Sequence, residues 1–412
     1  MQVNNLANSS SKQRPNFDLN LEGLRGYAAL AVGYTHIFGF KNLIDPSYHP
    51  ANYLDYLLPA HASVLIFFML SGYVIGLTNP ISNFSLENTR LYLIRRAVRL
   101  IPIYWIAILF SISVTPGNSL IEIFGNLFLF QGMFVDLIRN NTILWTLNYE
   151  FFYYLLFLGV WWLKPKLSFL LLISLTIAII GWLVPNAPQL LHGYAAGWIF
   201  WLIGLGLAWQ MQSEKEKSRR IPLLSYIFLL TATDSLSFGR LLLFGFGLKN
   251  VNAPIISLAD LTLLPICLLL FTAITNRRIL KLQSHNLKWI ELTCFAIPVI
   301  GCLFLFATKR LFDNIFWINS AIFTILAILF WRFKIEANIL SRLAGMGRIY
   351  YAFYIFHTPV MHLIHNYFPY QGSIWSFIFR SIIWFTLTIG ISIFLELVMQ
   401  PIIKRNLLQK LI

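Results

Sequence analysis

The chain is 412 residues long, and 58% of its residues are hydrophobic while only 11% are charged. Its mean hydropathy of +0.69 is well above what a soluble domain can hide in one core, which excludes a soluble globular protein. The net charge of +15 does not indicate nucleic-acid binding, because the basic residues form short clusters between apolar runs instead of one continuous face. Most of the chain is therefore expected to lie in lipid.

Apolar runs of roughly 18 to 25 residues recur along the chain, and each is long enough to cross the hydrocarbon layer as a helix. Helices fit better than a barrel because the runs do not alternate with period two. The predicted spans are 21–40, 56–77, 91–113, 144–163, 167–184, 194–210, 223–248, 254–275, 287–308, 315–331, 349–367 and 374–399. The pattern predicts an all-α fold, a polytopic integral membrane helix bundle of about ten to twelve transmembrane helices. Asp234 and Arg240 interrupt the seventh span, which is the least regular.

Basic clusters fall in alternate loops, and the positive-inside rule then places these loops and both termini in the cytoplasm. The clusters are Arg90/Arg95/Arg96, Lys164/Lys166, the run ending at Arg220, Arg277/Arg278/Lys281, Arg332/Lys334/Arg342/Arg348 and Lys404/Arg405/Lys410. Lys309 and Arg310 are the main exception. The chain is expected to have a cytoplasmic tail at 1–20, one membrane domain at 21–400 and a cytoplasmic tail at 401–412. Residues 115–141 are too mixed to span and predict an external segment or an interfacial helix.

The first span places a cation and a histidine on one helix face. It reads LEGLRGYAALAVGYTHIFGF, with Arg25 near its start and His36 eleven residues later. Eleven steps of ~100° return to nearly the same face, about 16 Å further along the axis. The alternatives are a line of functional groups, or a snorkelling arginine and a helix-to-helix hydrogen bond.

The second and third spans contribute a small-residue pair and an arginine pair. FFMLSGYVIG places Ser71 beside Gly72, either for close helix packing or for contact with a bound acyl group. RLYLIRRAVRLIPIYW places Arg96 and Arg99 three residues apart on one helix face. The two guanidiniums form a fork suited to phosphates, unless they serve only as a topology signal.

The fourth span carries Glu150 within LWTLNYEFFYYLLF, about two turns inside the apolar segment. A carboxylate at this depth costs roughly 2.5 to 3.5 kcal/mol, so it needs a partner or an aqueous cavity. Tyr153 lies one turn further on and is expected to share its hydrogen bonds.

The eleventh span, GRIYYAFYIFHTPVMHLIHNYF, puts Tyr354 and His357 on one face. A metal site is not predicted, because the spacings from His357 to His362 and His365 place the three rings on different faces. The two histidines His36 and His357, Glu150 and the arginine pair form one set. They supply a base that titrates near neutral pH, a carboxylate to orient it or to shuttle a proton, and a phosphate anchor.

These segments, in order, resemble membrane acyltransferase family 3, the bacterial enzymes that O-acetylate O-antigens, exopolysaccharides and Nod factors. LEGLRGYAALAVGYTH is similar to the family's opening Arg and His motif, and FFMLSGY, RRAVRLIPIY, LWTLNYEFFYY and GRIYYAFYIFHTPV are similar to its later motifs. Thr146 stands where the family usually has Ser, Tyr350 replaces the Ser before Tyr351, and the terminal Glu-x-Pro is stretched to Glu396 and Pro401.

The resemblance implies that His36 is the catalytic base, that Arg25 shares its motif, and that Arg96 and Arg99 hold the phosphates of coenzyme A. It also implies that Ser71, Glu150, Tyr153 and His357 line the site. Glu396 is given no role because its motif is stretched.

The expected function is transfer of an acyl group from acyl-coenzyme A to a hydroxyl of a cell-envelope or exported glycan or glycolipid. The acyl group is expected to be acetyl. His36 acts directly or through an acyl relay, with Glu150 fixing its protonation state. Acetyl-coenzyme A is expected to be a co-substrate, and no bound cofactor or metal is expected. Membrane lipid is the other expected partner. The expected location is the bacterial cytoplasmic membrane. The alternative is a proton-coupled transporter or a flippase of a polysaccharide assembly system. The sequence leaves the acceptor sugar and the oligomeric state open.

Overall fold

The computed structural model describes residues 18–184, 188–215, 220–248, 255–275, 277–279 and 284–411, and this part of the chain is almost entirely helical. Most of the expected N-terminal tail, and residues 216–219 of the basic run ending at Arg220, lie outside the described residues. The α-helices are α1 (Leu19–Gly39), α2 (Lys41–Ile44), α3 (Ala60–Thr78), α4 (Leu86–Val114), α5 (Leu120–Leu127), α6 (Trp145–Leu163), α7 (Leu167–Leu183), α8 (Gln189–Trp209), α9 (Leu223–Leu236), α10 (Phe238–Gly245), α11 (Leu264–Ile274), α12 (Ser284–Ala307), α13 (Ile315–Phe330), α14 (Ala344–Tyr367), α15 (Ile374–Ile393) and α16 (Gln400–Leu411).

Short elements connect the long helices. The 3-10 helices are η1 (Asn52–Tyr56), η2 (Ile81–Asn83), η3 (Thr142–Leu144), η4 (Leu258–Leu263) and η5 (Ala337–Leu343), and a π-helix, η6 (Phe394–Met399), joins α15 to α16. Two small antiparallel strand pairs link loops, β1 (Met211–Lys215) with β3 (Arg277–Ile279) and β2 (Arg220–Ile221) with β4 (Ile335–Glu336).

Polar residues set where several helices begin. The Asp18 carboxylate accepts a hydrogen bond from the backbone N–H of Asn20 at the start of α1, and the Ser85 hydroxyl does the same for Asn88 at the start of α4. The predicted seventh span is broken into α9 and α10 at Ser237, which adopts a left-handed conformation with φ 48°.

By length and composition, seven helices of the described chain can cross a membrane. They run over Asn52–Thr78, Leu86–Val114, Thr142–Leu163, Leu191–Trp209, Leu223–Gly245, Asn286–Ala307 and Ile374–Leu407, and shorter apolar helices cover Leu167–Leu183, Leu258–Ile274 and Ile315–Phe330. α1 and α14 belong to neither group, and both carry polar side chains along their length. Each of the twelve predicted spans coincides with a helix or with two successive helices, which confirms an all-α polytopic membrane bundle.

The outward faces of the peripheral helices are apolar. Large side chains such as Leu303 and Phe304 of α12, Leu329 of α13 and Phe379 of α15 are more than half exposed. A soluble monomer rarely leaves such continuous apolar faces in water, so these faces are suited to contact lipid.

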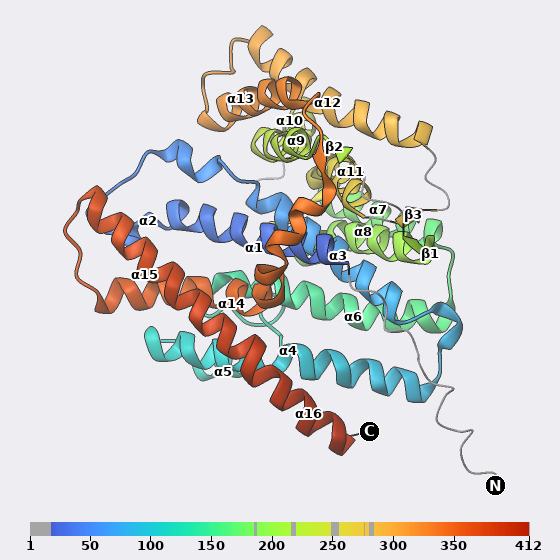
Figure 1. Cartoon of the computed structure of the whole chain (residues 1–412), viewed down its shortest axis with the longest axis vertical. Helices are drawn as coiled ribbons and strands as arrows, with labels where there is room; N and C mark the ends of the chain where they lie inside the picture. Colours follow the sequence, from blue (N-terminus) through green and yellow to red (C-terminus); the bar gives the residue numbers. More distant parts are fainter. Residues whose placement is uncertain are drawn as a thin grey trace.

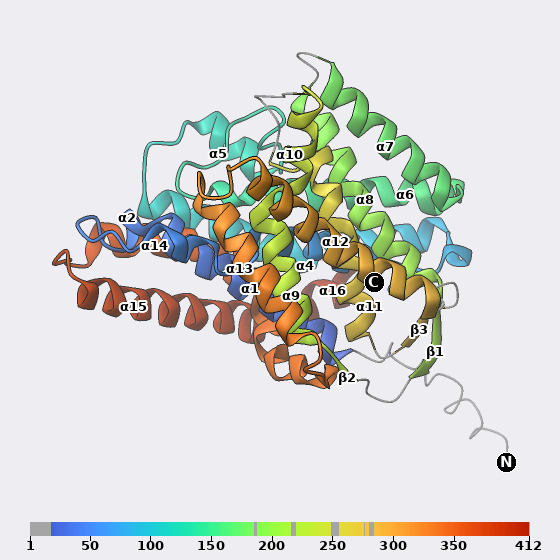
Figure 2. The same cartoon turned by 90° about the horizontal axis from the view of Figure 1, so that it is seen from above.

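The helices around the site run side by side (Figure 1). α3 packs on α8, α1 packs on α14 and α3, and α14 also contacts α4 and α15. α9, α12 and α13 pack together at one flank, and α15 and α16 form a long helical rod across the other elements, as the two views show (Figures 1 and 2). We call the end of the bundle at which α1 begins the near end, and the end at which α1 stops the far end.

The segment at 115–141 forms only one short helix in the structure. This helix, α5, is held against α4 by the Tyr104 hydroxyl, which donates to the backbone carbonyl of Asn126 at 2.7 Å. The segment therefore does not span, as expected.

Glycine at the α1–α14 contact lets the two backbones touch. A Cβ added at Gly347 would lie 2.0 Å from the carbonyl oxygen of Glu22, which is backbone and cannot turn away. This close approach fixes the position of α14 relative to α1, and both helices carry predicted site residues.

Gly347→Ala is therefore expected to destabilise the protein by about 1 to 3 kcal/mol, because the two helices must separate to admit the methyl group. Gly345→Ala is the matched control on the same helix, since a Cβ at Gly345 meets no atom within 4 Å. Thermal unfolding in detergent micelles measures both. Equal unfolding temperatures for the two variants would show that the contact tolerates a side chain.

Candidate active site

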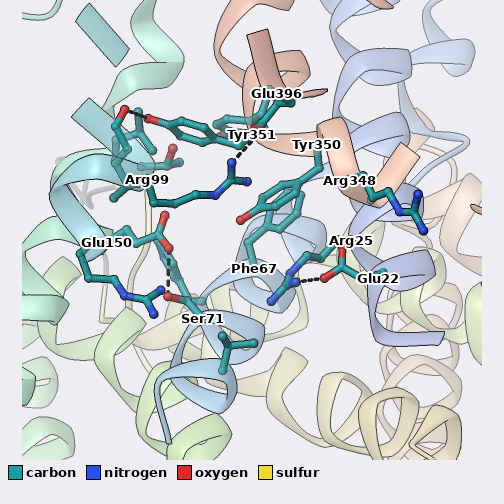
Figure 3. A pocket seen from close by; sticks show the side chains of 18 of the residues that line it. Glu22, Arg25, Phe67, Ser71, Arg99, Glu150, Arg348, Tyr350, Tyr351 and Glu396 are labelled. Atoms are coloured by element: carbon teal, nitrogen blue, oxygen red, sulfur yellow. Dashed lines mark hydrogen bonds and ion pairs between the residues drawn. The ribbon is translucent and has the colours of Figure 1, made fainter. Parts of the chain in front are cut away.

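A cavity of about 420 Å³ lies within the near half of the bundle (Figure 3). Its walls come from α1, α3, α4, α6, α14 and the π-helix η6. Its polar and charged lining residues are Glu22, Arg25, Ser71, Arg96, Arg99, Thr146, Glu150, Tyr154, Arg348, Tyr350, Tyr351, Tyr354 and Glu396. Charged side chains are costly to place in a membrane bundle. A cavity lined by this many of them is therefore typical of a substrate or ion site.

Two of the four arginines in this cavity already have carboxylate partners. Arg25 forms an ion pair with Glu22 one turn earlier on α1, and Arg99 of α4 forms one with Glu396 of η6. Figure 3 shows both pairs, with Tyr350 between Arg99 and Arg25. The Glu396 carboxylate also accepts the backbone N–H of Ala352 at 3.3 Å, which ties η6 to α14. The Arg99–Glu396 pair therefore joins two walls of the cavity, whereas the Arg25–Glu22 pair lies within α1.

The other two arginines, Arg96 and Arg348, form no ion pair with any residue that the structure describes. The Arg96 guanidinium lies over the rings of Tyr92 and Tyr154, 5.9 and 5.8 Å from their centroids, an arrangement that stabilises a cation without neutralising its charge. Its Nε is buried and has no hydrogen-bond partner within the described chain. The predicted arginine fork thus divides into a paired member, Arg99, and an unpaired member, Arg96.

Glu150 lies on the cavity wall, where its carboxylate accepts a hydrogen bond from the Ser71 hydroxyl at 2.9 Å and another from the Tyr154 hydroxyl. The prediction that Tyr153 shares these bonds is wrong, because the Tyr153 hydroxyl turns to α8 and donates to the carbonyl of Tyr194 at 3.0 Å. Glu150 makes no hydrogen bond to His36, so the expected pairing of these two groups is also corrected.

The partner of His36 is His357. Nδ1 of His36 lies 2.7 Å from Nε2 of His357, and Nδ1 of His357 lies 2.6 Å from the carbonyl oxygen of Tyr354. A carbonyl only accepts, so Nδ1 of His357 carries a proton and, in the neutral ring, its Nε2 has a lone pair. That lone pair accepts the Nδ1–H of His36, which leaves a lone pair on Nε2 of His36. The chain of bonds therefore presets His36 as a base.

The histidine pair lies beyond the far boundary of the cavity. His357 is fully buried, and neither ring is part of the lining. Tyr354, one turn before His357 on α14, does line it. Tyr354 thus connects the cavity to the pair, because its side chain lines the cavity and its backbone carbonyl accepts the Nδ1–H of His357.

Gly72 packs against a neighbouring helix and does not line the cavity. A Cβ at Gly72 would lie 2.0 Å from the carbonyl oxygen of Trp201 on α8. The small residue beside Ser71 therefore serves the α3–α8 contact, which is the packing alternative that the sequence left open.

A family model described as an acyltransferase domain matches residues 18–290. The chain belongs to acyltransferase family 3. It is accordingly a multi-pass membrane acyltransferase. No curated protein and no solved structure was found to match the chain. The match includes Arg25, His36 and Glu150, whereas His357 and Glu396, which complete the structural arrangement, lie beyond it.

Sequence reasoning gave no site role to several residues that line the acyltransferase cavity, among them two glutamates, a tyrosine and an arginine. These are Glu22, Tyr154, Arg348 and Glu396. A signal for the two glutamates existed, because an intramembrane carboxylate requires a partner wherever it occurs. Tyr153 and Tyr154 lie three and four residues after Glu150, so both are one turn away on α6, and only the neighbouring helices distinguish them.

Proposed function

We propose that this acyltransferase moves an acetyl group from acetyl-coenzyme A to a hydroxyl of a cell-envelope or exported glycan or glycolipid, and that it does so in the bacterial cytoplasmic membrane. The observation that carries the proposal is the combination of an arginine-lined cavity in the near half with a preset histidine pair just beyond it. Family membership supports acyl transfer, and the cavity suggests which donor is used.

The donor is proposed to enter from the near end, which the basic loops place on the cytoplasmic side. Arg96 and Arg348 are available to phosphates because neither is neutralised by a carboxylate of the described chain. Glu150 would accept the amide N–H groups of the pantetheine arm, and Tyr354 lies where that arm would leave the cavity toward His36.

His36 is the proposed catalytic base. The acceptor hydroxyl oxygen attacks the thioester carbonyl carbon, and its proton passes to Nε2 of His36. The tetrahedral intermediate then collapses with cleavage of the carbon–sulfur bond, and the thiolate takes the proton from His36, which gives an ester and free coenzyme A. His357 is a positioning residue, since it acts on His36 and not on the substrate.

Acyl transfer in membranes that contain the Arg96→Met variant tests donor binding. With radiolabelled acetyl-coenzyme A, the apparent KM for the donor is expected to rise about tenfold or more, because one charge-assisted phosphate contact is lost. Arg95→Met is the matched control, since Arg95 is the neighbouring residue, is exposed, and lies outside the cavity. An equal effect of both variants would assign Arg96 to membrane topology alone.

The runner-up function is a proton-coupled transporter or flippase, for which the buried carboxylates and histidines would form a proton path. A transporter needs no acyl donor. Wild-type membranes that take no label from acetyl-coenzyme A into glycans or glycolipids, and protein that coenzyme A does not stabilise against heat, would favour the runner-up.

A further inference from the structure

A second cavity, of about 280 Å³, lies at the far end of the bundle. Unlike the first, it is built around the break between α9 and α10, together with η1, η4 and the first turns of α3 and α13. Its polar and aromatic lining residues are Thr35, Asp55, Tyr56, His61, Thr233, Asp234, Ser235, Ser237, Arg240, Asp260, Thr262 and Phe316. We call it the far cavity. Asp234 and Arg240, which made the seventh span irregular in sequence, both belong to it.

Two of its aspartates, Asp234 and Asp260, form hydrogen bonds that hold neighbouring segments in place. Asp234 accepts the backbone N–H of Ala62 at 3.2 Å and so holds the start of α3. Asp260 pairs through one oxygen with Nε2 of His61 at 2.9 Å and accepts the N–H of Ser257 at 2.7 Å through the other. These bonds involve Oδ1 of Asp234, both oxygens of Asp260 and Nε2 of His61.

Asp55 differs from these two aspartates. Its Oδ1 is buried, and no hydrogen-bond partner for it exists in the part of the chain that the structure describes. A buried carboxylate oxygen without a donor costs free energy, so a cavity that contains one is suited to a ligand that brings donors.

The far cavity approaches the first cavity at the level of the histidine pair. On α3, His61 lines the far cavity and Val64 lines the first, a separation of three residues or about 4.5 Å of helix rise. On α1, Thr35 lines the far cavity and immediately precedes His36. The two cavities therefore approach each other from opposite ends of the bundle, and the far cavity reaches the residue next to the proposed base.

We propose that the far cavity binds the acyl acceptor, and that this acceptor presents an uncharged or amine-bearing sugar unit and not an acidic one. The proposal rests on the acyl-transfer function proposed above. Three aspartates line the cavity with one arginine and with His61, which pairs with Asp260. The excess of carboxylate disfavours anionic sugars and provides acceptors for hydroxyl or ammonium groups. Tyr56 and Phe316, with ring centroids 3.9 Å apart, add an aromatic surface for the apolar face of a sugar ring.

Two variants of the full-length protein test the site by transfer. Ser235→Trp fills the cavity, and Asp55→Asn removes the unpartnered charge without a change in size. Label entering the glycan fraction from acetyl-coenzyme A is expected to fall about tenfold or more in each, while the stabilisation of each variant by coenzyme A stays at the wild-type value. Ser82→Trp, an exposed serine outside both cavities, is the matched control and should transfer normally.

Unchanged transfer in Ser235→Trp would overturn the proposal. Transfer lost together with coenzyme A stabilisation would also overturn it, because the variant would then act through the whole bundle. Failure of the proposed function is distinguishable, since the wild type itself would then neither transfer label nor gain stability from coenzyme A.

A labelling measurement tests the cavity without turnover. In a chain with Cys302→Ser, where Cys267 and Cys294 are buried, Ser235→Cys is expected to react with a membrane-impermeant maleimide from the far side. Methyl glucoside and methyl glucosaminide should slow this reaction, and methyl glucuronide should not. A rate that none of the three glycosides changes, or that the glucuronide slows most, contradicts the proposed acceptor class.

Discussion

His36→Ala is expected to lower acyl transfer by about a hundredfold to ten-thousandfold, because the variant loses the base that accepts the hydroxyl proton. Binding of acyl-coenzyme A should be retained, since His36 is not part of the arginine-lined cavity. The expected loss therefore lies in the rate at saturating donor and not in the KM for the donor.

Label entering glycans from radiolabelled acetyl-coenzyme A, at equal protein abundance, measures this loss. His365→Ala is the matched control, because His365 lies on α14 near the far end, where its Nδ1 bonds to the Asn42 carbonyl. A His36→Ala enzyme with activity within a factor of about three of wild type would remove His36 from the proposed chemistry.

His357 variants separate positioning from catalysis. His357→Leu removes the acceptor for the Nδ1–H of His36, so the ring is free to rotate, and a misplacement of this kind can cost about a hundredfold in rate. His357→Gln keeps a carbonyl oxygen that can accept the same proton, and it is expected to recover part of the loss. If Leu and Gln at position 357 are equally inactive, the hydrogen bond is not what His357 contributes.

The helices were predictable because bilayer thickness imposes a length on every apolar run. Each of the twelve runs became a helix or two successive helices, and the one irregular run, with Asp234 and Arg240, is the one that the structure breaks at Ser237. A left-handed residue at a serine has no clear sequence signal, so the break itself could be suspected but not placed.

Site residues on a single helix were predictable from periodicity, whereas pairs between helices were not. The common face of Tyr354 and His357 follows from the helix repeat. Periodicity could not choose between Tyr153 and Tyr154 as the partner of Glu150, because the choice depends on α8. There Gly197 leaves room for the Tyr153 hydroxyl, which a Cβ at that glycine would approach to 2.3 Å.

The most consequential pair missed by sequence reasoning joins Arg99 to Glu396 across 297 positions. A single sequence contains no sign of which distant carboxylate meets which arginine, since that depends on how α4 packs against η6 and α14. The stretched spacing between Glu396 and Pro401 also argued against a role for Glu396. The physical rule that an intramembrane carboxylate must find a partner was the better guide.

Arg99→Met is expected to destabilise the protein by about 3 kcal/mol or more, whereas Glu396→Leu should cost only about 1 to 2 kcal/mol. The asymmetry follows from burial: the Glu396 side chain is 2% exposed, whereas that of Arg99 is 35% exposed toward the cavity. Loss of Arg99 leaves a buried carboxylate without its cation. Loss of Glu396 leaves a cation that the water in the cavity can still solvate.

The double variant Arg99→Met/Glu396→Leu should be about as stable as Glu396→Leu alone, since neither charge of this pair then remains. Unfolding in detergent micelles, followed for the four members of the cycle, measures the coupling free energy, and Arg95→Met corrects for the loss of one surface charge. If Arg99→Met is as mild as Arg95→Met, the ion pair does not hold η6 in place. In that case Arg99 would be free to bind donor phosphates together with Arg96, as the arginine fork in the sequence first indicated.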